Sequence, residues 1–175
     1  MKILITGIGL TGKSTFRRTL KKLFLKRGMP IKDIDGDYEE VPKEFEEKIL
    51  YLIEDVHGPT EEACLPLASY DLIIYLWPSF FSHLIFWLKR IWRWFQKGEG
   101  SWDKKRKDWL GSGKRYDPSN LPIFFRQLIR DFVNRKKWIA QDIKALSPFK
   151  NVTVIQPQWT KGGIKFNPIL HLHRL

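Results

Sequence analysis

The feature that most constrains this chain is a glycine-bounded segment near its N-terminus, residues 7 to 14. The segment reads Gly-Ile-Gly-Leu-Thr-Gly-Lys-Ser and matches the spacing G-x-x-x-x-G-K-[ST]. The apolar run Lys2 to Thr6 precedes it, and apolar residues at helical spacing follow it from Ser14 to Arg27. A strand, a glycine loop and a helix in this order are typical of a phosphate-binding P-loop. A chance glycine-rich turn is the alternative.

The residue types in this loop indicate a nucleoside triphosphate with Mg²⁺. Glycines allow backbone N–H groups to turn toward phosphate oxygens, and the start of the following helix adds positive potential. Lys13 is expected to reach the β- and γ-phosphates and Ser14 to ligate Mg²⁺. The predicted nucleotide-binding residues are Gly7, Gly9, Thr11, Gly12, Lys13, Ser14 and Thr15. The predicted cofactors are therefore ATP or GTP, and Mg²⁺.

Short apolar runs alternate with helical segments along the rest of the chain. The further predicted strands are residues 31–35, 49–53, 71–77 and 151–155, and the main predicted helices are residues 80–95 and 121–146. The runs lack strict alternation, which is typical of strands buried on both faces of a parallel sheet. We predict an α/β fold of the three-layer P-loop NTPase type with a five-stranded parallel sheet. Residues 1–175 are expected to form a single domain, since one domain usually has about 100 to 200 residues.

Residues 80–120 are predicted to be a basic, tryptophan-rich insert. From Lys89 to Arg115 the sequence has ten basic and three acidic residues, a balance of +7 within a total of +12. Such charge favours anionic partners, although it is also typical of a phosphate-handling site alone. The interleaved tryptophans could stack nucleic-acid bases, form a packing face of the helix at 80–95, or rest on a membrane surface. These alternatives stay open here.

Acidic residues end two of the predicted strands. Asp35-Gly36-Asp37 closes the second strand, and Glu54-Asp55 closes the third. Ligands of open parallel sheets collect at the carboxyl ends of the strands, so these acids are expected to face the P-loop. One carboxylate would hold the Mg²⁺ water shell, and another would orient or deprotonate an acceptor hydroxyl. A plain turn at residues 35–37 and a solvated strand end at residues 54–55 are the alternatives.

With these motifs the chain resembles the nucleoside-monophosphate-kinase-like group of P-loop kinases, and more loosely the DNA topology modulation proteins. The resemblance rests on residues 7–15, 35–38, 53–55 and 71–78, and covers most of residues 1–157. It implies ATP as the donor, Asp35 or Asp37 as the base, and Arg106 and Arg115 in a lid over the phosphates. It also implies Ser14 and Asp55 on the magnesium side.

One departure leaves the acceptor open. Several of those kinases have a basic residue after the acidic pair, where this chain has Tyr38, Glu39 and Glu40. We expect a Mg²⁺-dependent phosphotransferase that acts on a hydroxyl or phosphate of a nucleotide, a nucleic-acid end or a small metabolite. The alternative is a non-kinase P-loop NTPase that serves as a nucleotide-dependent module for binding nucleic acid or membrane.

The expected location is the cytoplasm, and membrane contact is the less favoured of the alternatives for the basic insert. The chain has one cysteine and no charged-then-apolar leader before the glycine loop. The longest uncharged run, Leu72 to Leu88, is near the lower length limit of a transmembrane helix, but Pro78, Ser79, Ser82 and His83 interrupt it. A strand followed by a helix therefore explains this run better than a membrane span.

Overall fold

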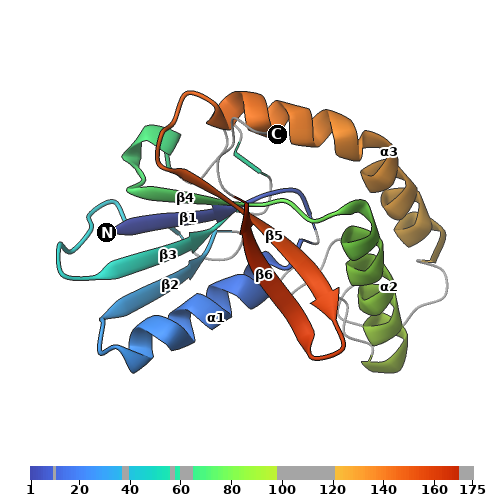
Figure 1. Cartoon of the computed structure of the whole chain (residues 1–175), viewed down its shortest axis with the longest axis horizontal. Helices are drawn as coiled ribbons and strands as arrows, with labels where there is room; N and C mark the ends of the chain where they lie inside the picture. The colour runs from blue at the N-terminus through green and yellow to red at the C-terminus, as the bar shows by residue number, and fades with distance from the viewer. Residues whose placement is uncertain (10, 37–39, 56–57, 60–64, 98–120, 170–175) are drawn as a thin grey trace.

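The computed structural model describes residues 1–9, 11–36, 40–55, 58–59, 65–97 and 121–169 of the 175-residue chain. The elements are β1 (Lys2–Thr6), α1 (Lys13–Lys26), β2 (Ile31–Asp35), β3 (Leu50–Glu54), the 3-10 helix η1 (Leu67–Ser69), β4 (Leu72–Leu76), α2 (Phe80–Lys97), α3 (Leu121–Leu146), β5 (Val152–Thr160) and β6 (Gly163–Ile169). Figure 1 shows α1 and α3 on opposite sides of the sheet, with α2 beyond the strand ends. The predicted α/β class is confirmed.

The strands form one sheet in the order β2-β3-β1-β4-β5-β6. The first five are parallel, and β6 is antiparallel to β5. β2 and β3 lie on one side of β1, and the chain then crosses to β4 on the other side. In sheets of this kind, the crevice outside the carboxyl ends at such a reversal is the usual place for a ligand. The segment that follows β1 begins at this crevice.

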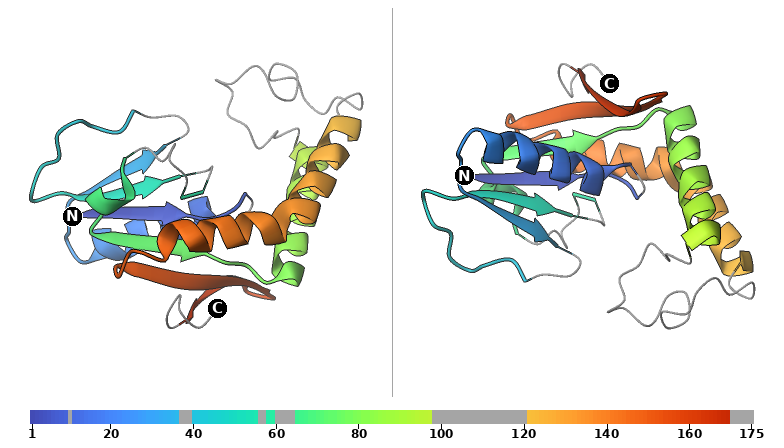
Figure 2. Two further views of the ribbon diagram at one scale, coloured as in Figure 1. Left: turned by 90° about the horizontal axis from the view of Figure 1, so that it is seen from above. Right: turned by 90° about the horizontal axis from the view of Figure 1, so that it is seen from below.

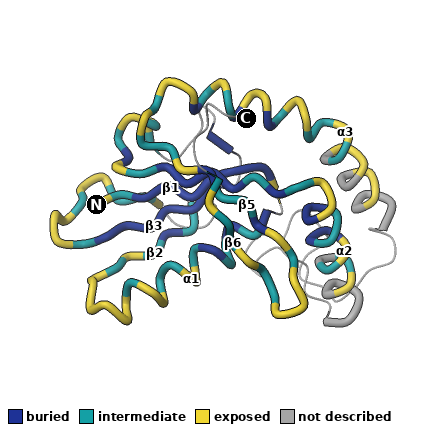
Figure 3. Tube along the Cα trace, in the orientation of Figure 1, coloured by how far each residue is buried: buried dark blue, intermediate teal, exposed yellow. Residues whose placement is uncertain are grey.

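Both faces of the sheet are buried, and each is covered by a different helix. On β1, Ile3 and Ile5 pack with Phe16 of α1, whereas Leu4 belongs to the cluster that includes Leu146 of α3. The tube in Figure 3 shows the buried residues concentrated in the central strands. Burial on both faces explains why β1, β3 and β4 are almost continuously apolar, because neither face of these strands has to present polar side chains to water.

The prediction of a five-stranded, fully parallel sheet is wrong in one respect, because the sheet has a sixth, antiparallel strand. β5 continues past Pro157 to Thr160, and a two-residue connection joins it to β6 at Gly163. The Ile155 carbonyl accepts from the backbone N–H of Trp77 on the β4 side. The backbone nitrogen of Pro157, two residues further on, faces the same side, but it lies beyond the last β4–β5 pair at Leu76 and Ile155. A proline is tolerated there because no neighbouring strand requires its N–H.

The two long helices agree with their predicted positions, and α2 extends two residues further, to Lys97. Figure 2 shows α2 and α3 together at the end of the molecule toward which β1 and β4 point. Among the described residues no helix is both long and apolar enough to cross a membrane. Most of the predicted basic insert, including Arg106 and Arg115, lies outside the described residues.

Candidate functional site

The glycine loop, residues 7–9 and 11–14 of the described chain, runs from the end of β1 to the start of α1. Gly7 has a φ of 140°, and a Cβ atom there would lie 2.6 Å from the Leu76 carbonyl oxygen at the end of β4. Gly12 has a φ of 86° and provides no side-chain cap for the first turn of α1. Glycine is therefore required at position 7 for space, and favoured at position 12 for backbone conformation. The uncapped N–H groups of a first helical turn are suited to an anion.

Lys13, the first residue of α1, is folded over this loop. Its side chain is buried, and its ammonium group donates to the carbonyl of Gly7 and, at 3.3 Å, to that of Ile8. Its charge also lowers the pKa of Glu54, although less than the Ser14 hydrogen bond and Arg17 do. A buried ammonium held by neutral carbonyls can be drawn to a phosphate, because charge-assisted hydrogen bonds are stronger than neutral ones.

Ser14 connects the loop to β3. Its hydroxyl donates to Glu54 Oε1 at 2.8 Å, and Glu54 is the last residue of β3, paired with Ile5 of β1. Burial raises the pKa of Glu54, while the Ser14 hydrogen bond and the charge of Arg17 oppose this. The neighbouring Asp55, predicted on the magnesium side, is also buried, and its backbone N–H donates to Ile5. The structure thus brings Glu54 rather than Asp55 to the Ser14 hydroxyl.

Arg17, one turn after Ser14 on α1, gathers three carboxylates. Its Nε lies 3.2 Å from Asp33 Oδ1 and 3.1 Å from Glu54 Oε2, and its Nη2 lies 3.1 Å from Asp35 Oδ2. Asp35 and Glu54 are neighbours in the β2–β3 register, and Lys21 adds a second ion pair to Asp33. These residues form the charged flank of the glycine loop, defined as Arg17, Asp33, Asp35 and Glu54. Asp35, a predicted base, is thus tied to an arginine, and Asp37 lies outside the described residues.

The opposite side of the loop contacts α2. Ser79 caps α2, since its Oγ accepts from the Ser82 N–H at 3.2 Å, and His83 follows one position later. His83 Nε2 lies 2.9 Å from the Gly9 carbonyl oxygen, and the imidazole is 1% exposed. Burial lowers the pKa of His83 to about 4, against the Gly9 hydrogen bond, which raises it, so the ring is neutral at pH 7.

A further buried carboxyl group lies on the α3 side. Asp142 accepts from the Tyr75 hydroxyl at 2.8 Å, across the face of the sheet that α3 covers. Burial raises the pKa of Asp142 to about 6, and the charge of Asp55 adds to this, whereas the Tyr75 hydrogen bond and Lys13 lower it. We call His83, Tyr75 and Asp142 the hydrogen-bonded flank of the loop.

Two further predicted residues of the loop, Thr11 and Thr15, differ in their hydrogen bonds. Thr15 lies in the first turn of α1, where its carbonyl accepts from Thr19. Thr11 is buried, and its Oγ1 has no hydrogen-bond partner among the described residues. A buried hydroxyl without a partner costs free energy, which is consistent with a group whose partner arrives with a ligand.

The sequence interpretation missed Arg17, His83 and Asp142. His83 and Asp142 each left a signal, because each is a titratable residue on an apolar helix face. Asp142 falls between Ile139, Ile143 and Leu146 at the helical spacing of the buried stripe of α3. Arg17 left no such signal, since a basic residue on a helix is usually solvated.

The residues around Ser14 fit Mg²⁺. Mg²⁺ prefers oxygen ligands and usually keeps several waters, so it needs only one or two protein groups. The Ser14 hydroxyl and the Glu54 carboxylate are adjacent and supply such oxygens. Across the described part of the chain, no group of three or more His, Cys, Asp or Glu residues could hold a metal by itself. The donor set therefore suits a metal that is also held by a bound phosphate.

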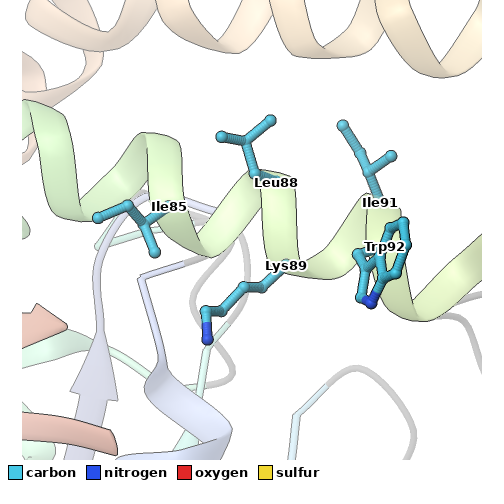
Figure 4. Close-up of a pocket in the computed structure, with 5 residues that line it drawn as sticks. All are labelled: Ile85, Leu88, Lys89, Ile91 and Trp92. Atoms are coloured by element: carbon cyan, nitrogen blue, oxygen red, sulfur yellow. The ribbon is translucent and has the colours of Figure 1, made fainter. Parts of the chain in front are cut away.

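A separate apolar hollow of about 800 Å³ lies on α2, lined by Ile85, Leu88, Lys89, Ile91 and Trp92. Figure 4 shows Leu88 and Ile91 on the side of α2 that faces α3, with Lys89 on the opposite side. The Lys89 ammonium lies 3.4 Å from the centre of the Trp159 ring, which joins α2 to the β5–β6 hairpin. This hollow is open and apolar, and it does not share residues with the glycine loop.

Comparisons of the chain with protein-family models, with curated proteins and with solved structures found no match. The functional argument therefore depends on the geometry of the glycine loop and its two flanks.

Proposed function

We propose that this chain is a Mg²⁺-dependent P-loop phosphotransferase that binds ATP at the glycine loop. The observation that carries the proposal is the hydrogen bond from Ser14 to Glu54, within a strand, glycine loop and helix that also bury Lys13. Together they set an ammonium, a hydroxyl and a carboxylate around one uncapped helix start. This is the set of groups that a triphosphate with its metal requires.

Each residue has a distinct role in this proposal. The backbone of Gly7, Gly9, Gly12 and Thr15 and the hydroxyl of Thr11 bind phosphate oxygens, and Lys13 leaves the loop carbonyls for the transferred phosphoryl group. Ser14 and Glu54 hold the metal, which when bound offsets the negative charge that develops on the phosphates. Glu54 replaces Asp55 as the first candidate on the metal side, because only Glu54 is hydrogen-bonded to Ser14 among the described contacts.

The acceptor is proposed to be a nucleotide, a nucleic-acid end or a small hydroxylated metabolite. Asp35 and Asp37 remain the proposed bases, and Arg106 and Arg115 the proposed lid arginines. The Arg17 contact bears on the choice between the two aspartates. Asp35 is already held by the Arg17 guanidinium, so Asp37 is the first candidate for the base. The strongly basic composition supports an anionic acceptor.

The proposal is tested by incubating the protein with γ-labelled ATP, Mg²⁺ and separate pools of nucleosides, nucleotides and 5′-hydroxyl oligonucleotides. Transfer of label to a pool supports the phosphotransferase. Hydrolysis without transfer in every pool would instead support the alternative, a nucleotide-dependent binding module. Absence of ATP binding would refute both functions.

Lys13→Ala is the direct test of the loop, and Lys21→Ala is its matched control. Both remove a lysine of α1, but Lys21 contacts Asp33 and lies outside the loop. We expect Lys13→Ala to weaken ATP binding by about tenfold or more, the size of a lost charged hydrogen bond. Lys21→Ala should bind ATP as the wild type does. Equal affinity of the two variants, measured by titration calorimetry, would contradict the proposed role of Lys13.

A further inference from the structure

Side-chain donors bind three consecutive carbonyls of the glycine loop. Lys13 donates to the carbonyls of Gly7 and Ile8, and His83 approaches that of Gly9 at 2.9 Å. A carbonyl oxygen accepts only, so the His83 Nε2 must carry the hydrogen. Carbonyl oxygens that point at a phosphate would repel it, so each of these contacts removes an obstacle to anion binding.

The two donors differ in what happens when a nucleotide binds. In the proposed function Lys13 turns to the phosphates and releases its carbonyls. His83 has no such second task, because its ring is buried between the loop and α3, with its centre 5.2 Å from that of Phe132. The contact between His83 and Gly9 can therefore persist in the nucleotide-bound state.

The position of His83 is fixed from three elements. Ser79 caps α2 one turn earlier and accepts from the His83 N–H through its own carbonyl at 2.9 Å. Arg135 of α3 donates to the Pro78 carbonyl just before this cap. Phe132 contacts both His83 and Phe80, with ring centres 5.2 and 5.4 Å apart. The imidazole therefore lies where the β4–α2 connection, α2 and α3 pack together.

We propose that His83 is a positioning residue for phosphate binding, which holds the Gly9 carbonyl oxygen toward α2 and so keeps this acceptor from facing the bound phosphates. An acceptor oxygen that faces an anion repels it, so a donor that satisfies this oxygen on the α2 side favours phosphate binding. This inference rests on the proposed function, because it assumes that the loop binds phosphate.

The test compares His83→Gln with His83→Asn and His83→Leu. A glutamine amide can reach the place of the Nε2–H donor, whereas the shorter asparagine cannot, and leucine keeps apolar volume without a donor. We expect the glutamine variant to bind ATP within about twofold of the wild type, and the other two about fivefold to tenfold more weakly, the effect of one lost hydrogen bond. Equal affinity of the glutamine and asparagine variants would overturn the inference.

Phe132→Leu is the control for packing. Its side chain contacts the His83 ring from α3 but makes no described contact with the loop. We expect a lower melting temperature and a smaller loss of ATP affinity than in His83→Leu, because the imidazole donor remains. A loss of affinity equal to that of His83→Leu would show that packing, and not the hydrogen bond, is responsible, and would overturn the inference. If the leucine variant of His83 does not fold, the comparison of glutamine with asparagine still decides.

Two further measurements separate this inference from the proposed function. Imidazole ¹⁵N shifts should show the Nε2–H tautomer at pH 7, and the Nδ1–H tautomer would overturn the inference. Lys13→Ala is measured in parallel. A wild type that binds no ATP refutes the proposed function, whereas a wild type that binds ATP, with a weakened Lys13→Ala and equal His83 variants, refutes the role of His83 alone.

Discussion

On one side of the glycine loop charges are paired, and on the other side buried polar groups are held by hydrogen bonds to uncharged partners. In the charged flank Arg17 lies within 3.2 Å of oxygens from three carboxylates. In the hydrogen-bonded flank His83 meets a backbone carbonyl and Asp142 meets a tyrosine hydroxyl. The loop is therefore supported by two different kinds of interaction, and we expect the two flanks to respond differently to substitution and to pH.

The largest expected effect is on the charged flank. Arg17→Met removes one guanidinium and leaves three carboxylates close together, with Glu54 among the buried residues. Breaking a buried ion pair by removing one partner typically costs about 3 to 5 kcal/mol, and we expect a loss of this order in the free energy of unfolding. Urea unfolding at pH 7 measures it.

Lys21→Met is the matched control for this substitution. Lys21 pairs with Asp33, but its side chain is 40% exposed, so its removal should change the free energy of unfolding by less than about 1 kcal/mol. Similar losses in Lys21→Met and Arg17→Met would show that the charged flank has no special dependence on Arg17.

The next effect concerns His83 and acid. The unfolded chain takes up a proton on histidine near pH 6.5, whereas the folded chain does so only near pH 4, because burial lowers the His83 pKa. The unfolded state therefore binds more protons in this window, and His83 makes stability rise with pH between 4 and 6.5. His83→Gln should lose less stability than the wild type between pH 7 and pH 4, by up to about 3 kcal/mol.

The measurement is the difference in the free energy of unfolding at pH 7 and pH 4 for both proteins. Carboxylates elsewhere also respond to acid, but they are common to both proteins and cancel in the comparison. Identical pH dependence of the two proteins would contradict a buried neutral imidazole at position 83.

Asp142 should show the opposite sign and a slightly smaller effect. Its pKa is raised to about 6, so the folded state binds more protons than the unfolded state between pH 4 and 6, and stability falls as pH rises through this window. Asp142→Asn removes the ionisable group and can still accept from Tyr75. We expect it to stabilise the fold at pH 7 by up to about 3 kcal/mol and to have little effect at pH 4. A destabilised Asp142→Asn at pH 7 would indicate that the carboxylate charge is needed there.

Much of the fold followed from local patterns in the sequence. The first four strands, α1 and α3 have strong apolar periodicity, and their positions were predicted to within about two residues, the usual precision for element boundaries. The sixth strand was missed because Pro157 was interpreted as the end of a strand. The strand ended later because β4, the neighbour that would have needed the missing N–H, had already ended.

The glycine loop itself was predicted from its spacing, but the partners of its side chains were not. Glu54 and Asp55 are adjacent and both buried, so the sequence contained no alternation that could show which one meets Ser14. Arg17, His83 and Asp142 contact residues that are distant along the chain. These contacts depend on how the strands and helices are arranged, which local sequence patterns do not show. Helix periodicity could identify His83 and Asp142 as buried polar groups without identifying their partners.

The β5–β6 hairpin has a consequence for the order of folding. Its turn joins Thr160 to Gly163 across two residues, whereas the pairing of β4 with β5 joins Ile73 to Val152. Closing a short loop requires far less chain entropy than closing a long one, and hairpins form within about 1 to 10 μs. We therefore expect the hairpin to form early and to dock as a unit. Its Phe166 then meets Phe16 beside the glycine loop, and its Trp159 meets Lys89 of α2. The hairpin, whose strands come last in chain order, thus joins α1 to α2.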